Sequence, residues 1–323
     1  MTVIVLDGAT GTEIERHGGP LRAPLRAPLW SAQALLDDPA LVRRIHLEYL
    51  EAGAQVLTTN SFRTHARNLA AAGLAHRADA LTTLSVRLAC EARDEYTRKH
   101  AAGANVRIAG AISPLEDCFQ PADSPGRDAG PEHRKIATML VEAGADLLLI
   151  ETMGRIDEAR AAVAAAQGLG RPIWLAVVAR ADGHMLAGET LADLVAALAD
   201  LELHALLLNC TDLQHLEVAL PALCAATATR PALWAGAYPH TGHHDPERGW
   251  LTHAIDREAF ADGLAAWSLR LPQLRLLGGC CGSTPAWIAA LARHLHPGDA
   301  ARTAGFTALA AAVPRALSVY SPA

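Results

Sequence analysis

Residues 145–178 read ADLLLIETMGRIDEARAAVAAAQGLGRPIWLAVV, and the order of apolar and polar segments in this stretch decides the fold class. The apolar run at residues 147–150 is followed by the polar pair Glu151-Thr152 and by a helical pattern over residues 155–167, which ends at Gly168. A second apolar run covers residues 173–178. Short runs without polar alternation are typical of strands covered on both faces, as in parallel sheets. The stretch therefore predicts a strand–helix–strand unit with parallel strands.

The same alternation extends along the chain in both directions. Apolar runs recur at residues 3–6, 55–59, 106–112, 147–150, 173–178, 205–208, 233–237 and 274–277. Helical patterns cover residues 38–52, 132–143, 155–167, 190–201 and 284–295. Strands that alternate with helices in this way predict an α/β fold, a single-domain (β/α)8 TIM barrel. The alternative is an open doubly wound sheet, but no G-x-G-x-x-G motif follows the first run.

The chain of 323 residues offers no linker rich in Pro, Gly or Ser between candidate domains. We assign the barrel to residues 1–299 and expect the Ala-rich residues 300–323 to form a helical tail that packs on it. Two stretches rich in Pro, Asp or Gly, residues 18–30 and 115–131, are expected to be long loops.

The composition excludes several classes of protein. Hydrophobic residues make up 51% and charged residues 19% of the chain, which excludes intrinsic disorder. The net charge of −6, without a basic block, gives no footprint for nucleic acid. No apolar run reaches the roughly 20 residues that cross a bilayer. The N-terminus lacks the basic region of a signal peptide, so we expect a cytoplasmic protein.

Polar and sulfur-containing residues are concentrated just after the predicted strands. In a barrel, these positions gather at one face and build the active site. They include Asp7, Gly8, Ala9, Asn60, Glu151, Thr152, Asn209, Cys210, Tyr238, Cys280 and Cys281. Because Cys210 follows the sixth strand and Cys280-Cys281 follows the eighth, three thiolates can converge on one cation. Gly278-Gly279 would let the backbone bend so that both adjacent cysteines reach it.

Soft thiolates select Zn²⁺, and three protein ligands leave a fourth position open, as in catalytic sites. Taken alone, Cys210 is equally compatible with core packing, and the Cys280-Cys281 pair with redox chemistry. Cys90 and Cys224 lie in helical stretches and are assigned to packing, while Cys118 lies in a loop and has no assigned role. The segment at residues 239–245 is a rival metal signal, but its spacing matches no common zinc motif, so we expect a solvated loop.

Three thiolates give the site a net negative charge, which suits the binding of a fourth thiolate and keeps that sulfur nucleophilic. The chemistry expected of such a site is alkylation of a thiol substrate. For an amino-acid substrate, Asp7 and Glu151 offer carboxylates to its ammonium group, although each has the alternative of a satisfied structural carboxylate. The backbone amides at residues 9–11 could hold its carboxylate.

Five short segments lie at the predicted strand ends: Leu6-Asp7-Gly8-Ala9, Thr59-Asn60-Ser61-Phe62, Glu151-Thr152-Met153, Asn209-Cys210-Thr211 and Gly278-Gly279-Cys280-Cys281-Gly282. Together they resemble the homocysteine S-methyltransferase family, and the resemblance covers nearly the whole chain. It implies a zinc-containing (β/α)8 barrel with Cys210, Cys280 and Cys281 as the ligands. It also implies that Asp7 and Glu151 bind the amino group of homocysteine, with Gly8, Ala9, Asn60, Thr152, Asn209 and Tyr238 completing the substrate-binding set.

We therefore predict zinc-dependent transfer of a methyl group from a small donor to the thiol of homocysteine, forming methionine. No catalytic residue is expected beyond the zinc-bound thiolate. Relatives that use S-methylmethionine often carry Tyr-Pro-Asn-Ser-Gly after the seventh strand, where this chain has Tyr238-Pro239-His240-Thr241-Gly242. The chain has neither room for folate and cobalamin domains nor an Asp-x-His-x-x-Gly signature, which favours a free donor.

We expect the donor to be S-methylmethionine or S-adenosylmethionine, with a betaine as the second candidate. Tyr238 or Trp250 is a candidate for stacking on the donor cation. Selenocysteine is an alternative acceptor. Two other classes stay open: a barrel hydrolase that uses metal-activated water, and a non-catalytic protein that binds zinc or thiols.

Overall fold

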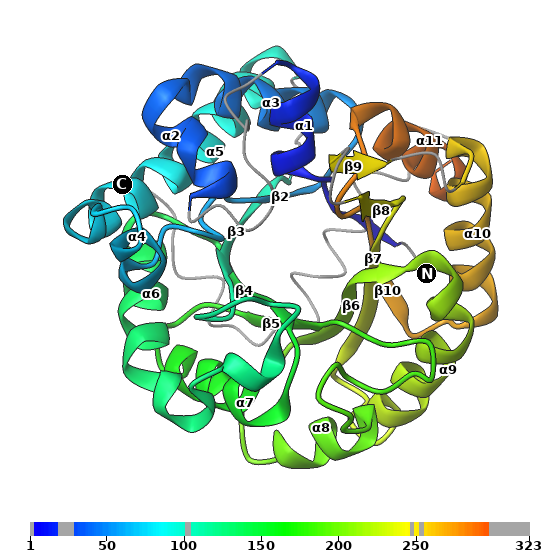
Figure 1. Cartoon of the computed structure of the whole chain (residues 1–323). Helices are drawn as coiled ribbons and strands as arrows, with labels where there is room; N and C mark the ends of the chain where they lie inside the picture. Colours follow the sequence, from blue (N-terminus) through cyan, green and yellow to red (C-terminus); the bar gives the residue numbers. More distant parts are fainter. Residues whose placement is uncertain (1–2, 19–28, 101–104, 246–248, 252–254, 297–323) are drawn as a thin grey trace.

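Eight parallel strands form one sheet, in the order β1-β10-β7-β6-β5-β4-β3-β2. The structure is a computed structural model that describes residues 3–18, 29–100, 105–245, 249–251 and 255–296. The sheet closes between its first and last strands, where Leu6 bridges Val56 and the Gln55 amide donates to the Val5 carbonyl at 2.8 Å. Figure 1 shows the strands as a central ring with the helices outside it. The predicted (β/α)8 barrel is confirmed.

The barrel strands are β1 (Ile4–Val5), β2 (Val56–Thr58), β3 (Arg107–Ile112), β4 (Leu147–Met153), β5 (Ile173–Val177), β6 (Ala205–Asp212), β7 (Trp234–His240) and β10 (Leu274–Leu277). The α-helices are α1 (Thr10–Arg16), α2 (Gln33–Asp37), α3 (Pro39–Glu51), α4 (Ala66–Ala70), α5 (Ala78–Lys99), α6 (Gly130–Glu142), α7 (Ile156–Ala166), α8 (Leu191–Ala197), α9 (Leu216–Thr227), α10 (Arg257–Arg270) and α11 (Pro285–Leu295). Each of the eight predicted apolar runs overlaps one of these strands.

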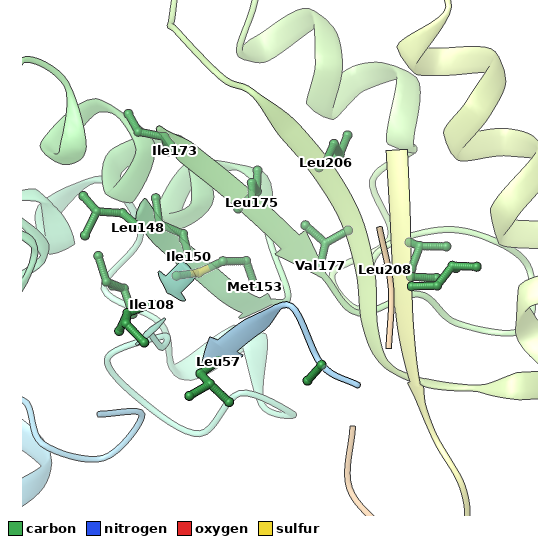
Figure 2. Packing of buried hydrophobic residues seen from close by; sticks show 14 of the residues in the cluster. Leu57, Ile108, Leu148, Ile150, Met153, Ile173, Leu175, Val177, Leu206 and Leu208 are labelled. Carbon is green, nitrogen blue, oxygen red and sulfur yellow. The ribbon is translucent and has the colours of Figure 1, made fainter. Parts of the chain in front are cut away.

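Both faces of each strand are buried, which explains why the runs show no polar alternation. In β4, Leu148 and Ile150 pack outward into the layer between strands and helices, while Leu147 and Leu149 point into the barrel. Figure 2 shows the outward set, in which Leu57, Ile108, Leu175 and Leu206 come from four other strands. The barrel interior is a smaller cluster that includes Ile4, Trp174 and Leu276, and Cys280 packs against it.

Several predicted boundaries differ from the structure. Strands β4, β6 and β7 continue past their apolar runs, to Met153, Asp212 and His240, so polar residues expected after the strands lie within them. The pairing register shifts in β4 after Ile150 and in β6 after Asn209. Beyond each shift the strand continues, but its side chains no longer follow the regular pleat. Helix α8 ends at Ala197, earlier than the predicted residue 201.

The histidine-rich segment is not the loop that we expected. His240 ends β7, and β8 (His243–Asp245) pairs antiparallel with β9 (Gly249–Leu251), so backbone pairing orders this segment. The expected tail at residues 300–323 and most of the expected loop at residues 18–30 lie outside the described residues, as does the Trp250 side chain. Within the described ranges, no helix combines the length and apolarity that a bilayer span requires.

The close packing of the barrel interior gives a stability prediction at Gly236 in β7. A Cβ atom there would lie 2.7 Å from both the Cβ and the carbonyl oxygen of Leu276, and 2.8 Å from Leu207 Cδ2. We expect Gly236→Ala to lower the free energy of unfolding by about 1–3 kcal/mol, the usual cost of overpacking a core. Denaturant unfolding monitored by circular dichroism measures this difference.

Gly263 in α10 is the matched control, because a Cβ there meets nothing within 4 Å. Gly263→Ala should raise stability by about 0.5–1 kcal/mol, since Ala favours the helix over Gly. Equal effects of the two substitutions would contradict the packing argument.

Candidate active site

Three thiols meet at the carboxyl ends of the strands. The Sγ atoms of Cys210 and Cys280 are 2.8 Å apart, and those of Cys210, Cys280 and Cys281 all lie within 4.8 Å of one another. The three residues are reduced cysteines in the structure. Hydrogen bonds from the Cys210 and Cys280 thiols lower the pKa of Cys281 well below its usual range. The cluster can therefore hold negative charge on sulfur and ligate a soft metal ion.

Unusual backbone geometry turns Cys210 toward its partners. Cys210 has a φ of 45° and Thr152 a φ of 62°, both in the left-handed region that residues with a Cβ rarely adopt. The Thr152 amide donates to Asn209 Oδ1 at 3.1 Å, and Asn209 Nδ2 donates to Thr152 Oγ1 at 2.8 Å. These two bonds join β4 and β6 across β5 and hold both strained residues in place. Asn209, predicted to bind substrate, is fully buried and lies behind the described wall of the site.

The segment after β10 is tied to the segment after β1. Ser283 Oγ donates to the Cys280 carbonyl at 2.7 Å, and the Ala9 amide lies 3.3 Å from the same hydroxyl. The reason that we gave for Gly278-Gly279 is wrong, because neither residue has a positive φ. What these positions require is space: a Cβ at Gly278 would lie 2.6 Å from Leu6 Cβ, and one at Gly279 would lie 2.3 Å from Ser283 Oγ.

Two buried carboxylates share this face of the barrel. Asp7 accepts hydrogen bonds from the Thr58 amide at 2.7 Å and the Thr58 hydroxyl at 2.8 Å. Glu151 accepts one from the Tyr238 hydroxyl at 3.1 Å. Burial raises the pKa of Asp7 to about 7 and that of Glu151 to about 8. Such groups are stabilised in their ionised form by a cation, and a substrate ammonium group can provide one.

The thiols and carboxylates line one cavity of about 700 Å³, a typical size for a small-molecule site. Gly8, Ala9, Asn60, Thr152 and Tyr238, all predicted to bind substrate, also line it. Sequence reasoning missed the outer wall, which includes Trp30, Arg63, Asp117, Phe119 and Gln120, and it gave no role to Phe62 or Cys118. Apart from Trp30, which begins a 3-10 helix over Trp30–Ala32, these residues lie in loops, where no periodic pattern indicates which side chains face the cavity.

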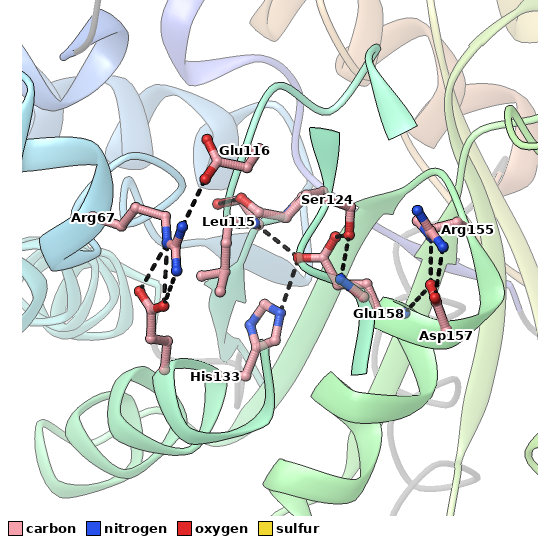
Figure 3. Close-up of polar contacts among 12 residues, drawn as sticks. Arg67, Leu115, Glu116, Ser124, His133, Arg155, Asp157 and Glu158 are labelled. Carbon is pink, nitrogen blue, oxygen red and sulfur yellow. Dashed lines mark hydrogen bonds and ion pairs between the residues drawn. The ribbon is translucent and has the colours of Figure 1, made fainter. Parts of the chain in front are cut away.

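The loop between β3 and α6, which carries Cys118 and Phe119, is held by a buried polar network (Figure 3). Glu158 on α7 accepts hydrogen bonds from the Leu115 amide at 2.9 Å and from Ser124 Oγ, and His133 Nε2 lies 3.2 Å from it. Arg67 on α4 pairs with Glu116 at 2.9 Å. The loop is therefore anchored at several points, and residues 117–120 line the cavity.

Two other groups of ligand-type residues are already paired. Glu13, His17 and Glu48 lie close enough to share an ion, but Arg16 Nε donates to both oxygens of Glu13, at 2.9 and 3.0 Å. His240, in the rival histidine segment, bonds Asp212 Oδ1 at 2.9 Å.

Comparisons with known proteins agree with this geometry. A family model described as Homocysteine S-methyltransferase matches residues 4–295. The chain is 34% identical to the homocysteine S-methyltransferase of Escherichia coli K12 over 90% of its length and 94% of that protein. It is 31% identical to the selenocysteine Se-methyltransferase of Brassica oleracea, over 90% of this chain and 88% of that one. The crystal structure of the metallated form of the E. coli homocysteine methyltransferase MmuM superposes with a TM-score of 0.77 and 32% identity, covering 90% of this chain and 96% of that chain.

The raised pKa of Glu151 predicts a pH-dependent stability difference between the wild type and Glu151→Gln. Well below pH 4.5 the wild-type side chain is neutral in both folded and unfolded states. As the pH rises toward about 8, the unfolded chain ionises while the buried group resists, so the free energy of unfolding falls. Gln cannot ionise, so the variant should be close to the wild type at pH 5 and more stable by up to a few kcal/mol at pH 9.

Urea unfolding of the substrate-free protein, with a chelator present, measures this difference at both pH values. Glu217→Gln, at an exposed position on α9, controls for the substitution itself. A Glu151→Gln difference that does not change with pH would contradict the assignment.

Proposed function

The chain belongs to the homocysteine S-methyltransferase family, and we propose that it transfers a methyl group from a small sulfonium donor to the sulfur of homocysteine, with Zn²⁺ bound by Cys210, Cys280 and Cys281. The product is methionine, so the proposed role is in methionine biosynthesis. One observation carries the proposal: three thiols and two buried carboxylates line the same cavity. The thiols suit a soft ion and a thiol substrate, and the carboxylates suit an amino acid.

The donor set of the cluster favours Zn²⁺ over harder ions, because all three side chains offer sulfur. Tetrahedral Zn–S bonds of about 2.3 Å place sulfur atoms about 3.8 Å apart. The three Sγ atoms lie within 4.8 Å of one another, and the Cys210 and Cys280 Sγ atoms, 2.8 Å apart, would have to separate by about 1 Å to bind the ion. When bound, the ion would keep a fourth, substrate thiol ionised at neutral pH.

The remaining wall of the cavity is suited to the amino-acid part of homocysteine. Asp7 and Glu151 would bind the ammonium group, which would offset the burial that raises their pKa values. The amides of Thr10 and Gly11, at the start of α1, would face the carboxylate, because the first amides of a helix have no partner within it. The Ala9 amide is less available than we predicted, since it is already within 3.3 Å of Ser283 Oγ.

The methyl transfer itself needs the acceptor sulfur and the donor methyl group to lie in line. The homocysteine sulfur attacks the methyl carbon, the bond between that carbon and the donor sulfur breaks, and its electron pair stays with the leaving thioether. The thiol proton of homocysteine goes to solvent. Positive and negative charge cancel in this step, so the aromatic side chains in the cavity wall, Trp30, Phe62 and Tyr238, would favour it over bulk water.

Selenocysteine is a second candidate acceptor. A selenol is as soft as a thiol, and the similarity to a selenocysteine Se-methyltransferase supports it. The same amino-acid contacts would hold either acceptor.

Metal analysis tests the zinc assignment. Purified protein should carry close to one Zn²⁺ per chain, and Cys280→Ser should lower that content at least tenfold, because one of three ligands is lost. Cys224→Ser is the control, since Cys224 is buried in α9 away from the cluster. Inductively coupled plasma mass spectrometry gives the metal content, and thermal melting checks that both variants are folded. A Cys280→Ser protein with full zinc would refute the ligand assignment.

Methionine formation from homocysteine tests the reaction. We expect turnover with S-methylmethionine or S-adenosylmethionine, weaker turnover with glycine betaine, and loss of at least a hundredfold in the Cys280→Ser variant. Chromatography of the products measures the rate, and Cys224→Ser again serves as control. Zinc-loaded protein that forms no methionine with any donor would instead indicate a non-catalytic zinc- or thiol-binding barrel, and hydrolysis of the donor without transfer would indicate a hydrolase.

A further inference from the structure

The outer part of the cavity wall includes a guanidinium group, that of Arg63, to which the proposed reaction gives no role. Arg63 follows β2, and its guanidinium carbon lies 5.4 Å from the centre of the Phe62 ring, which in turn makes an edge contact of 5.9 Å with Trp30. All three residues line the cavity. Gly11 makes room for this corner, because a Cβ there would lie 2.3 Å from the Trp30 ring.

Arg63 has no carboxylate partner among the described residues. Its Nη1 donates to the amide oxygen of Asn68 at 3.3 Å, and its Nε is buried without a hydrogen-bond partner. Arg67, in the following helix α4, shows the contrast, since its guanidinium pairs with both Glu116 and Glu132. A half-buried guanidinium that lines a cavity and has an unpartnered donor is suited to bind a carboxylate from a ligand.

A free acceptor lies in the same loop. Asn60 is 2% exposed, and its Nδ2 donates to the Ser31 carbonyl at 2.9 Å. Its Oδ1 is buried and has no partner. A buried acceptor of this kind is stabilised by a ligand N–H. Arg63 and Asn60 thus offer the two complementary groups that a zwitterionic amino acid requires, separate from the carboxylates at Asp7 and Glu151.

We propose that Arg63 and Asn60 form a second amino-acid subsite, which binds the carboxylate and the ammonium group of the methyl donor. The proposal rests on the proposed function and identifies the donor class as an α-amino-acid sulfonium, to which S-methylmethionine and S-adenosylmethionine belong. A betaine has no ammonium N–H, and a simple trialkylsulfonium has neither group. The Phe62 and Trp30 rings, beside Arg63, offer aromatic surface to the sulfonium centre.

Calorimetric titration of the zinc-loaded full chain tests this subsite without turnover, because homocysteine is left out. For S-methylmethionine, we expect Arg63→Gln to raise the Kd by about 10- to 100-fold, as for the loss of a charge-assisted hydrogen bond. Arg63→Lys should recover part of the affinity. For trimethylsulfonium, the wild type and both variants should have the same Kd. Arg87→Gln, at an exposed position on α5 outside the cavity wall, is the matched control.

Three results would overturn the subsite: no binding of S-methylmethionine by the wild type, an unchanged Kd in Arg63→Gln, or equal losses for both sulfonium ligands. A separate titration with homocysteine should give the same Kd in the wild type and Arg63→Gln. A rise there would show that Arg63 serves the acceptor, which would refute the donor subsite and leave the proposed reaction standing. Failure of methionine formation with every donor would refute the reaction whatever these Kd values are.

Discussion

The arrangement of the site depends on two hydrogen bonds between Asn209 and Thr152. They cross from β6 to β4 and hold two residues with side chains in left-handed backbone conformations. Strain of this kind costs about 1–3 kcal/mol per residue and persists only where the surroundings enforce it. Asn209 is fully buried, so water cannot compete for its carboxamide. Without these two hydrogen bonds, we expect Cys210 to adopt the regular strand conformation, which would not direct its side chain toward Cys280.

Charge is divided across the cavity. The carboxylates of Asp7 and Glu151 lie beside the thiols at the strand ends, where burial disfavours ionisation of both carboxyl groups. Arg63 stands on the outer wall, where burial raises the pKa of the Cys118 thiol to about 12 and the Arg63 charge offsets part of that rise. A reaction that cancels a sulfonium charge against a thiolate fits such a cavity, because it removes charge from a place that solvates charge poorly.

The sequence predicts the barrel well because eight apolar runs without alternation require strands that are covered on both faces, and Leu147–Met153 shows this residue by residue. The meeting of Cys210, Cys280 and Cys281 follows from the same topology.

The outer wall could not be predicted, since Arg63 and Phe119 face the cavity only because of the paths of their loops. Gly278 and Gly279 were predicted to permit a backbone bend, whereas the structure shows that they leave room for Leu6 and Ser283. That crowding arises only from tertiary structure, so the sequence could not indicate it. The β8–β9 hairpin was missed because its three-residue strands are too short to show a period.

The first strand, Ile4–Val5, is only two residues long. It pairs with β10, near the far end of the described chain, and the adjoining Leu6 bridges Val56 in β2. The Ala9 amide and the Ser283 hydroxyl meet across 274 positions, and Cys210 and Cys280 across 70. Contacts of such separation form late, because the chain must lose much entropy before they are made. Asp7 and the Cys280-Cys281 pair lie near opposite ends of the described chain, and the pairing of β1 with β10 brings them together. Asp7 therefore joins the thiols only when the barrel closes, so the complete pocket cannot form before the fold does.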